Sequence, residues 1–215
     1  MLDVLRAGLD AERSHRAESL FRAGVAAGRI QFRLRVDRTN YVMLDSIRTA
    51  IPSNAPPLLS GTYQPLGKSL FEPVYADDYS SQDERNVAIH LDGEAAVMWW
   101  HRNGAKAGNG LQGWQRQKIY PDFIFAASQQ AGANRIVVLE TKGDHLAGNV
   151  DTSYKTGVMQ LLTGTFDWER THPAGGLELV DEDGTSVQCE MVLMSKLPTE
   201  LPRLVLPDGA ISTAM

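Results

Sequence analysis

Two acidic residues and a lysine stand close to the ends of two consecutive apolar segments. Residues 120–125 read Tyr-Pro-Asp-Phe-Ile-Phe and carry Asp122, and residues 138–143 read Val-Leu-Glu-Thr-Lys-Gly and carry Glu140 and Lys142. A pair of carboxylates suits a hard divalent ion such as Mg²⁺, which binds carboxylate oxygens and keeps waters for a substrate phosphate. A neighbouring ammonium can stabilise the charge that develops on a reacting phosphate. These residue types predict metal-assisted phosphoryl chemistry, with Asp122 and Glu140 as metal ligands.

The spacing explains how the three side chains would meet. The turn-rich piece between the two segments is centred on residue 131, and a symmetric hairpin about that centre pairs Asp122 with Glu140. Directly opposed residues of an antiparallel pair have Cβ atoms about 4.5–5.5 Å apart. Alternation along the second strand places Lys142 on the face of Glu140 and Thr141 on the other face. A plain ion pair of Lys142 with one of the acids at a strand end fits the same spacing, so both interpretations stay open.

The first seventy residues predict an extension with one helix and one strand. Helical spacing of leucines over residues 2–27 favours a helix that Gly28 would stop, and alternation over residues 30–36 is typical of a half-exposed strand. Four prolines between residues 51 and 67 indicate a linker or long surface loop. We therefore expect an N-terminal extension over 1–69 and a main domain over 70–215.

The main domain reads as an α/β fold with a mixed central sheet flanked by helices. We expect a helix over 81–91 and strands over 95–100, 120–127 and 135–142, the last two apolar on both faces. A second helix would start at Thr152 with Asp151 as its cap. Its apolar face would comprise Tyr154, Val158, Leu161, Leu162 and Phe166. Segments 177–180 and 187–194 would close the fold as a hairpin around residues 183–184.

Composition narrows the class of protein. The 215 residues include a single cysteine, Cys189, which excludes an internal disulfide and favours a buried thiol in a reducing, cytoplasmic setting. No apolar run approaches the roughly 18 residues of a membrane-spanning helix, and residues 1–29 lack the apolar stretch of a secretory signal. No Gly-x-Ser-x-Gly nucleophile elbow is present, which argues against a serine hydrolase.

Several spaced blocks resemble one nuclease group. Tyr-Pro-Asp-Phe-Ile and Val-Val-Leu-Glu-Thr-Lys-Gly look like the core motif of the PD-(D/E)XK nuclease superfamily. Together with residues 84–92, 100–103 and 144–155, they resemble the C-terminal endonuclease domain of type III restriction enzymes and of related DEAD/DEAH helicase-nuclease proteins, over about 71–168. The resemblance implies a restriction-endonuclease-like core and an Mg²⁺-dependent DNA endonuclease of a restriction-modification or defence system. It also implies a helicase or translocase motor, or a specificity subunit, in cis or in trans; the chain has no phosphate-loop motif of its own.

Carried over by position, the resemblance assigns Asp122 and Glu140 to the metal, for which Mn²⁺ could replace Mg²⁺, and Lys142 to catalysis. Glu84 matches an acid that often completes such sites, although a first-turn charge favoured by the helix dipole explains it as well. Gln160 matches a polar position on the helix after the motif. The residues that could contact DNA, each of which could also be an ordinary surface charge, are Arg102, Lys106, Arg116, Lys118 and Lys155. The alternative function is a catalytically silent nucleic-acid-binding or scaffolding module attached to a helicase motor.

The net charge of -5 generates a first prediction about DNA binding. Counterion release scales with the number of phosphates that a protein neutralises, so a chain with scattered basic residues should bind duplex DNA weakly and with a shallow salt dependence. The measurement is a titration of labelled duplex DNA with the 215-residue chain at 50 and 200 mM salt. Tight binding that drops by about 10³-fold or more between these salts, or that selects a sequence, would contradict the expectation.

Overall fold

The computed structural model shows a mixed α/β architecture and describes the chain in segments. The described residues are 2–30, 32–35, 41–42, 56–79, 81–104, 109–128, 134–143, 149–163, 166–167 and 186–205. Structural statements below concern these residues. The predicted strand at 177–180 and the turn at 183–184 lie outside them, as does Lys106.

A four-stranded mixed sheet forms the centre of the fold. Its order is β3 (Val97–Arg102), β5 (Phe123–Ser128), β6 (Asn134–Lys142) and β8 (Ser186–Leu193). The β3–β5 and β5–β6 pairs are antiparallel, and β6–β8 is parallel. Phe123 pairs with Leu139 and Ser128 with Asn134, which confirms the predicted hairpin register about residue 131. The predicted strand at 95–100 begins and ends two residues later than expected, because Val97 is the first residue to pair with β5.

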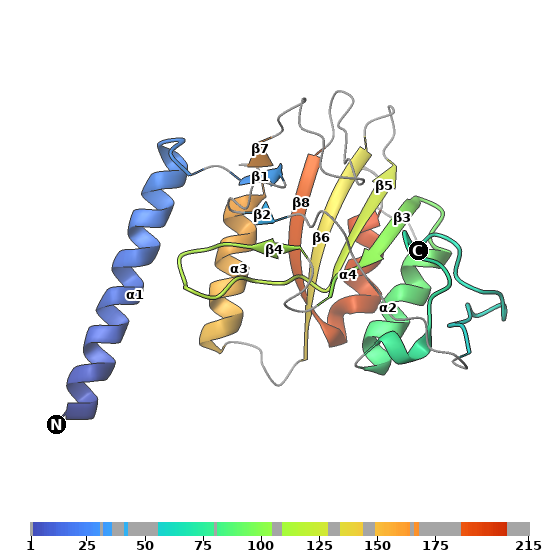
Figure 1. Ribbon diagram of the computed structural model, residues 1–215, viewed down its shortest axis with the longest axis horizontal. Helices are drawn as coiled ribbons and strands as arrows, with labels where there is room; N and C mark the ends of the chain where they lie inside the picture. Colours follow the sequence, from blue (N-terminus) through green and yellow to red (C-terminus); the bar gives the residue numbers. More distant parts are fainter. Residues whose placement is uncertain are drawn as a thin grey trace, which may run out of the picture.

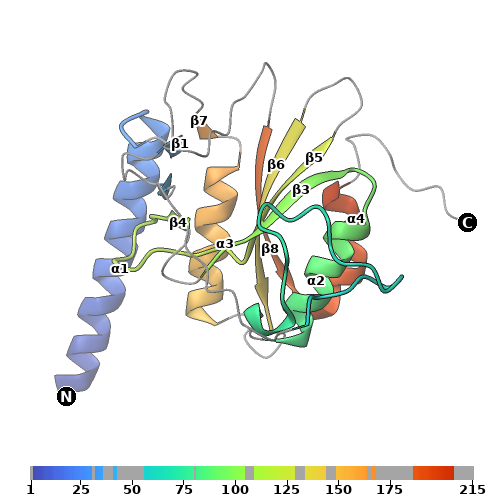
Figure 2. The same cartoon turned by 45° about the vertical axis from the view of Figure 1, so that its right-hand side comes forward.

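Helices cover both faces of this sheet (Figures 1 and 2). On one face, α2 (Gln82–Gly93) and α4 (Leu197–Val205) enclose a core that includes Trp100, Phe123 and Phe125. On the other face, α3 (Val150–Leu162) packs over Ile124, Ile136 and Val138. All six residues of β5 except Ser128 are buried. The expectation of a mixed sheet flanked by helices, with central strands that are apolar on both faces, is confirmed.

The start of α3 corrects one prediction. Asn149, not Asp151, caps the helix: its backbone is extended, and its side-chain oxygen accepts the N–H of Thr152 at 2.6 Å. Asp151 lies one residue inside the helix, in the first turn, where a negative charge is favoured by the helix dipole. Phe166 is also not part of the apolar face of α3, because the helix ends at Leu162 and Phe166 belongs to strand β7 (Phe166–Asp167).

The predicted N-terminal helix is confirmed as α1 (Leu2–Ala26), followed by Gly28 with a φ of 66°. Glycine adopts this left-handed conformation without steric cost, which explains the stop. Figure 1 shows α1 projecting from the body, with its far end away from the sheet. Near its C-terminal end, Phe21 is buried and its ring lies 5.9 Å from that of Trp114, so in the described part of the chain α1 meets the body through its last turns.

The predicted strand at 30–36 is β1 (Phe32–Arg35), which lies in a second, smaller sheet of order β4-β2-β1-β7. Its other members are the short strands β4 (Gly110–Leu111), β2 (Tyr41–Val42) and β7. This sheet joins the extension to segments of the main domain. In the Pro-rich stretch, Leu58 and Leu66 are buried in the same core as α2 and α4. The boundary near residue 69 stays a prediction.

Short 3₁₀ turns precede α2 and α4, namely η1 (Ala76–Asp78) and η3 (Met194–Lys196). Strand β8, expected as one arm of a closing hairpin, has β6 as its parallel partner in the described part of the chain. Among the helices described, none is long and apolar enough to cross a membrane.

The close approach of Gly113 to α3 generates a prediction about stability. A Cβ at Gly113 would stand 2.5 Å from Cγ2 of Val158 and 2.6 Å from Oη of Tyr154, both of which belong to buried side chains. Gly113→Ala should therefore lower the free energy of unfolding by about 1–3 kcal/mol, as overpacking does. Urea unfolding measures it, with Gly61→Ala as control, because nothing lies within 4 Å of a Cβ there. Equal stability of the two variants would show that Val158 and Tyr154 of α3 shift at no measurable cost to accommodate the added methyl group.

Candidate active site

Asp122 is held in place by its backbone and its side chain. It stands directly before β5, its N–H donates to the carbonyl of Leu139 at 2.9 Å, and its carbonyl accepts the N–H of Asn103 at 2.8 Å. Oδ2 of Asp122 accepts two hydrogen bonds from Thr141, one from the backbone N–H at 2.7 Å and one from the hydroxyl at 2.6 Å. The carboxylate is thus oriented by the residue that follows Glu140.

Glu140 is the most deeply buried charge of the cluster. It lies in β6 with 4 % of its side chain exposed. Its Oε1 accepts a hydrogen bond from Nζ of Lys155 at 2.7 Å, and Nζ of Lys142 is 3.6 Å from the same oxygen. Its Oε2 is buried and has no hydrogen-bond partner among the described residues. A buried carboxylate oxygen left without a partner is costly, and a cation would satisfy it.

Two lysines and Asp151 complete the cluster. Lys142 comes from the end of β6 and Lys155 from the second turn of α3, and their side chains are 15 % and 18 % exposed. Oδ2 of Asp151 lies 3.3 Å from Nζ of Lys142 and 3.7 Å from Nζ of Lys155. Asp151 is 55 % exposed, so it forms the outer edge of an ion-pair network whose inner end is Glu140.

Burial dominates the electrostatics of the two acids. Desolvation raises the pKa of Asp122, and the charge of Glu84 raises it further, against the opposing hydrogen bonds of Thr141. Desolvation also raises the pKa of Glu140, with a second contribution from Asp122, and these outweigh the two lysines. For Lys155, burial works to lower the pKa, but Glu140 and Asp151 outweigh it and the pKa is raised. The charge of Asp122 therefore acts on Glu140, in addition to the effect of burial.

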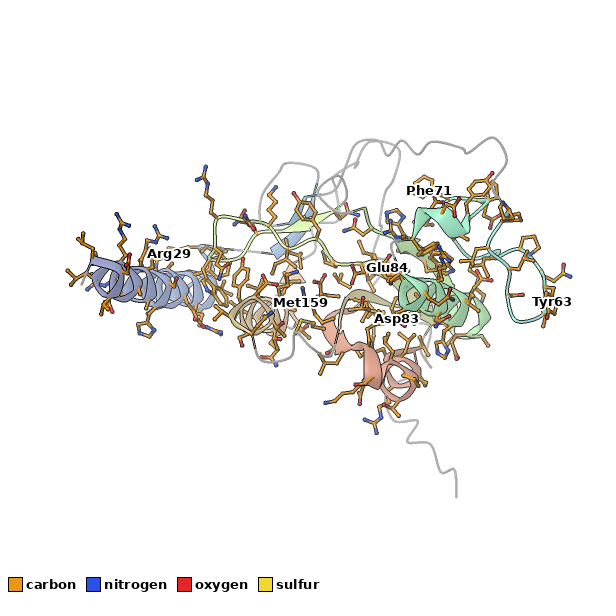
Figure 3. All side chains as sticks on the ribbon, turned by 90° about the horizontal axis from the view of Figure 1, so that it is seen from below. Arg29, Tyr63, Phe71, Asp83, Glu84 and Met159 are labelled. Atoms are coloured by element: carbon orange, nitrogen blue, oxygen red, sulfur yellow. The ribbon has the colours of Figure 1, made fainter. Side chains whose placement is uncertain are left out.

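Glu84 lies in the first turn of α2 and is labelled in Figure 3. Its Oε2 accepts hydrogen bonds from Nε and Nη2 of Arg102, at 3.3 and 3.0 Å. The guanidinium of Arg102 also lies over the ring of Tyr79, 5.2 Å from the ring centre. Glu84 is near enough to raise the pKa of Asp122, but its charge is matched by Arg102. The role of Glu84 as an acid of the site stays a prediction, and so does the role of Arg102 as a DNA contact.

The other predicted residues lie apart from this cluster or at its edge. Gln160 is exposed on α3, and Arg116 is exposed in the segment between β4 and β5. Lys118 is half-buried, and its side chain runs past Gly110 in β4. Of the four proposed DNA-contacting residues that the structure describes, Lys155 contacts Glu140 directly.

Three residues of the site escaped the sequence analysis in their actual roles. Alternation predicts Thr141 on the face opposite Glu140, yet its backbone N–H and hydroxyl donate to Asp122 where the strand pairing ends. The sequence predicts Asp151 as a helix cap, and in the structure it lies between the two lysines instead. Asn103 is buried, and its side-chain amide donates to the carbonyls of Pro121 and Asn109, at 2.8 Å each. No spacing rule predicts the hydrogen bond from Asn103 to Pro121, because the two residues are 18 positions apart in the sequence.

The residues present fit a divalent cation with few protein ligands. Among the described residues, no group of three or more His, Cys, Asp or Glu side chains is placed to hold a metal ion. Mg²⁺ does not need such a group, since it is commonly bound through one or two carboxylates while waters and phosphate oxygens complete the shell. Asp122 and Glu140 supply two carboxylates, and Oε2 of Glu140 is a buried oxygen without a hydrogen-bond partner in the described part of the chain.

Comparison of the chain with the models of known protein families, with curated proteins and with solved structures gives no match. The fold itself defines the chain as a mixed α/β protein. In the absence of a match, the chemistry of the site is inferred from the geometry of its residues.

The raised pKa of Glu140 generates a prediction about stability and pH in the absence of metal. Where the folded pKa lies above the unfolded one, the folded state binds more protons, so stability falls as pH rises from about 4.3, the ordinary glutamate value, through the folded pKa. Glu140→Gln removes this contribution and should flatten the decline. Unfolding free energies measured with urea between pH 4 and 8 in EDTA test it.

Glu12→Gln, which alters an exposed ion pair on α1, is the control and should keep the wild-type pH dependence. A wild-type protein whose stability rises throughout that pH range, or a Glu140→Gln variant with an unchanged slope, would show that burial does not disfavour the charged form of Glu140.

Proposed function

We propose that this chain is an Mg²⁺-dependent DNA endonuclease domain that hydrolyses phosphodiester bonds and has a restriction-endonuclease-like core. The observation that carries the proposal is the buried carboxylate of Glu140, with one oxygen lacking a partner, beside Asp122 and two ammonium groups. A structural ion pair would leave no reason to bury a second acid next to the first, since like charges close together in a poorly solvated place repel.

The acids and the lysines divide the work of such a site. Bound to Asp122 and Glu140, Mg²⁺ would acidify a water and neutralise charge on the phosphate. Thr141 holds the Asp122 carboxylate in position through two hydrogen bonds, so the ligand needs little reorganisation when it binds. Lys142, mostly shielded from solvent, can donate hydrogen bonds to a phosphate oxygen and stabilise the charge that develops there.

The lysine ammonium is not the base of this proposal. The ammonium of Lys142 lies between two carboxylates, 3.6 Å from Glu140 and 3.3 Å from Asp151. Its role is to orient the attacking water or to stabilise negative charge, and the proton of the water leaves to solvent.

The surroundings support a dependent nuclease rather than a free-standing one. The net charge is negative, and Arg102 is engaged by Glu84. DNA would be presented by a helicase or translocase motor or by a specificity subunit, in cis or in trans. The competing function, a silent nucleic-acid-binding or scaffolding module, requires no metal and no turnover.

Cleavage tests the proposal directly. Incubated with plasmid DNA and Mg²⁺ at high protein concentration, the wild-type chain should nick or cut, and EDTA should abolish the reaction. Asp122→Asn, Glu140→Gln and Lys142→Met should each lower the rate by about a hundredfold or more, as the loss of a group that stabilises transition-state charge does. Asp83→Asn is the matched control, because Asp83 is an exposed first-turn acid of α2 beside Glu84 (Figure 3).

A folded single variant of Asp122, Glu140 or Lys142 that cuts at the wild-type rate would remove that residue from the mechanism. Cleavage that persists in EDTA, or no cleavage by wild-type protein with Mg²⁺ or Mn²⁺ even when a motor protein presents the DNA, would favour the silent module.

A further inference from the structure

Lys155 already occupies a cation position at Glu140. Its Nζ lies 2.7 Å from Oε1 of Glu140, nearer than Nζ of Lys142 at 3.6 Å. The lysine comes from α3, the helix that packs on the face of the sheet carrying Ile124 and Val138. Of the two lysines that contact Glu140 among the described residues, Lys155 is the nearer, and this carboxylate is almost fully shielded from water.

A divalent ion and Lys155 would compete for the same carboxylate. A cation bound between Asp122 and Glu140 would share Glu140 with the ammonium of Lys155, and two positive charges so close repel strongly where solvent is excluded. The ammonium has a second acceptor within reach, because Oδ2 of Asp151 lies 3.7 Å away on the preceding turn of α3. The flexible lysine stem allows this transfer without movement of the helix.

We propose that Lys155 is a displaceable counter-ion, which pairs with Glu140 in the metal-free protein and moves to Asp151 and a substrate phosphate when a divalent cation binds at Glu140. The inference rests on the proposed function, because it requires Asp122 and Glu140 to be metal ligands. Its consequence is an order of events: Lys155 becomes available to a DNA phosphate only after the cation is in place.

Titration calorimetry of the full chain with Mn²⁺ provides the first test. Lys155→Met removes the competitor and should tighten the dissociation constant about tenfold, the size expected for one neighbouring like charge. Lys155→Arg keeps the charge and should stay within about threefold of wild type. Arg16→Met is the control, because it removes a positive charge from an exposed ion pair on α1.

The outcomes separate this inference from the proposed function. If wild-type protein does not bind Mn²⁺, or Glu140→Gln binds it equally well, the proposed metal site itself is wrong. If wild-type binding depends on Glu140 but Lys155→Met binds Mn²⁺ no more tightly, the metal site stands and the counter-ion role of Lys155 is overturned.

A measurement on wild-type protein needs no variant to fold. Brief acylation of lysines with an N-hydroxysuccinimide ester, followed by peptide mass spectrometry, reports how accessible each amine is. With saturating Mn²⁺, labelling of Lys155 should rise several-fold relative to Lys68, whose ammonium donates to the carbonyl of Glu94. Unchanged or reduced labelling of Lys155 would mean that its ammonium stays on Glu140, which overturns the displacement.

Discussion

The energetic problem of this molecule is the burial of two carboxylates at one end of the β5–β6 pair. The last pair of the β5–β6 register is Phe123 with Leu139, and Asp122 and Glu140 are the next residues at that end of the two strands. Desolvation raises the pKa of both acids. Two sets of contacts among the described residues offset this cost. Thr141 donates two hydrogen bonds to Asp122, and the ammonium groups of Lys142 and Lys155 lie close to Oε1 of Glu140. Oε2 of Glu140 is buried and receives no hydrogen bond from any described residue.

The two faces of the sheet contribute different parts of the site. The face covered by α3 supplies Lys155 and Asp151, so the packing of that helix sets the positions of both charges. Behind α3, Trp114 packs edge-on against Tyr154 at 5.0 Å, and Phe21 of α1 packs against Trp114. The other face supplies α2, whose first turn carries Glu84. A change in helix packing on either side therefore alters the electrostatics of the acids without touching them.

Backbone contacts around Asp122 add rigidity where β5 has not yet begun. Asn103, at the end of β3, donates from its backbone to Asp122 and from its side chain to Pro121. These bonds tie the residue after β3 to the two residues before β5, which are distant in sequence. Preorganisation of this kind reduces the reorganisation that a ligand carboxylate needs when it binds a cation.

The amino-acid sequence by itself determined the mixed α/β class, the helix ending before Gly28, the apolar central strands and the hairpin register about residue 131. These follow from local periodicity and from the symmetry of one short hairpin, which a sequence displays directly. The order β3-β5-β6-β8 and the parallel partner of β8 were not accessible in this way, because strand neighbours depend on which faces are buried together.

Only the tertiary structure decided which charges surround the two acids. Lys155 and Glu140 are 15 residues apart and meet because α3 packs over β6, while Glu84 and Arg102 pair across α2 and β3. Periodicity places a side chain on a face of its own element, and it says nothing of the distance to a residue on another element. The cap at Asn149 shows the same limit at short range: Asn149 and Asp151 are both good caps, and the turn geometry selected the first.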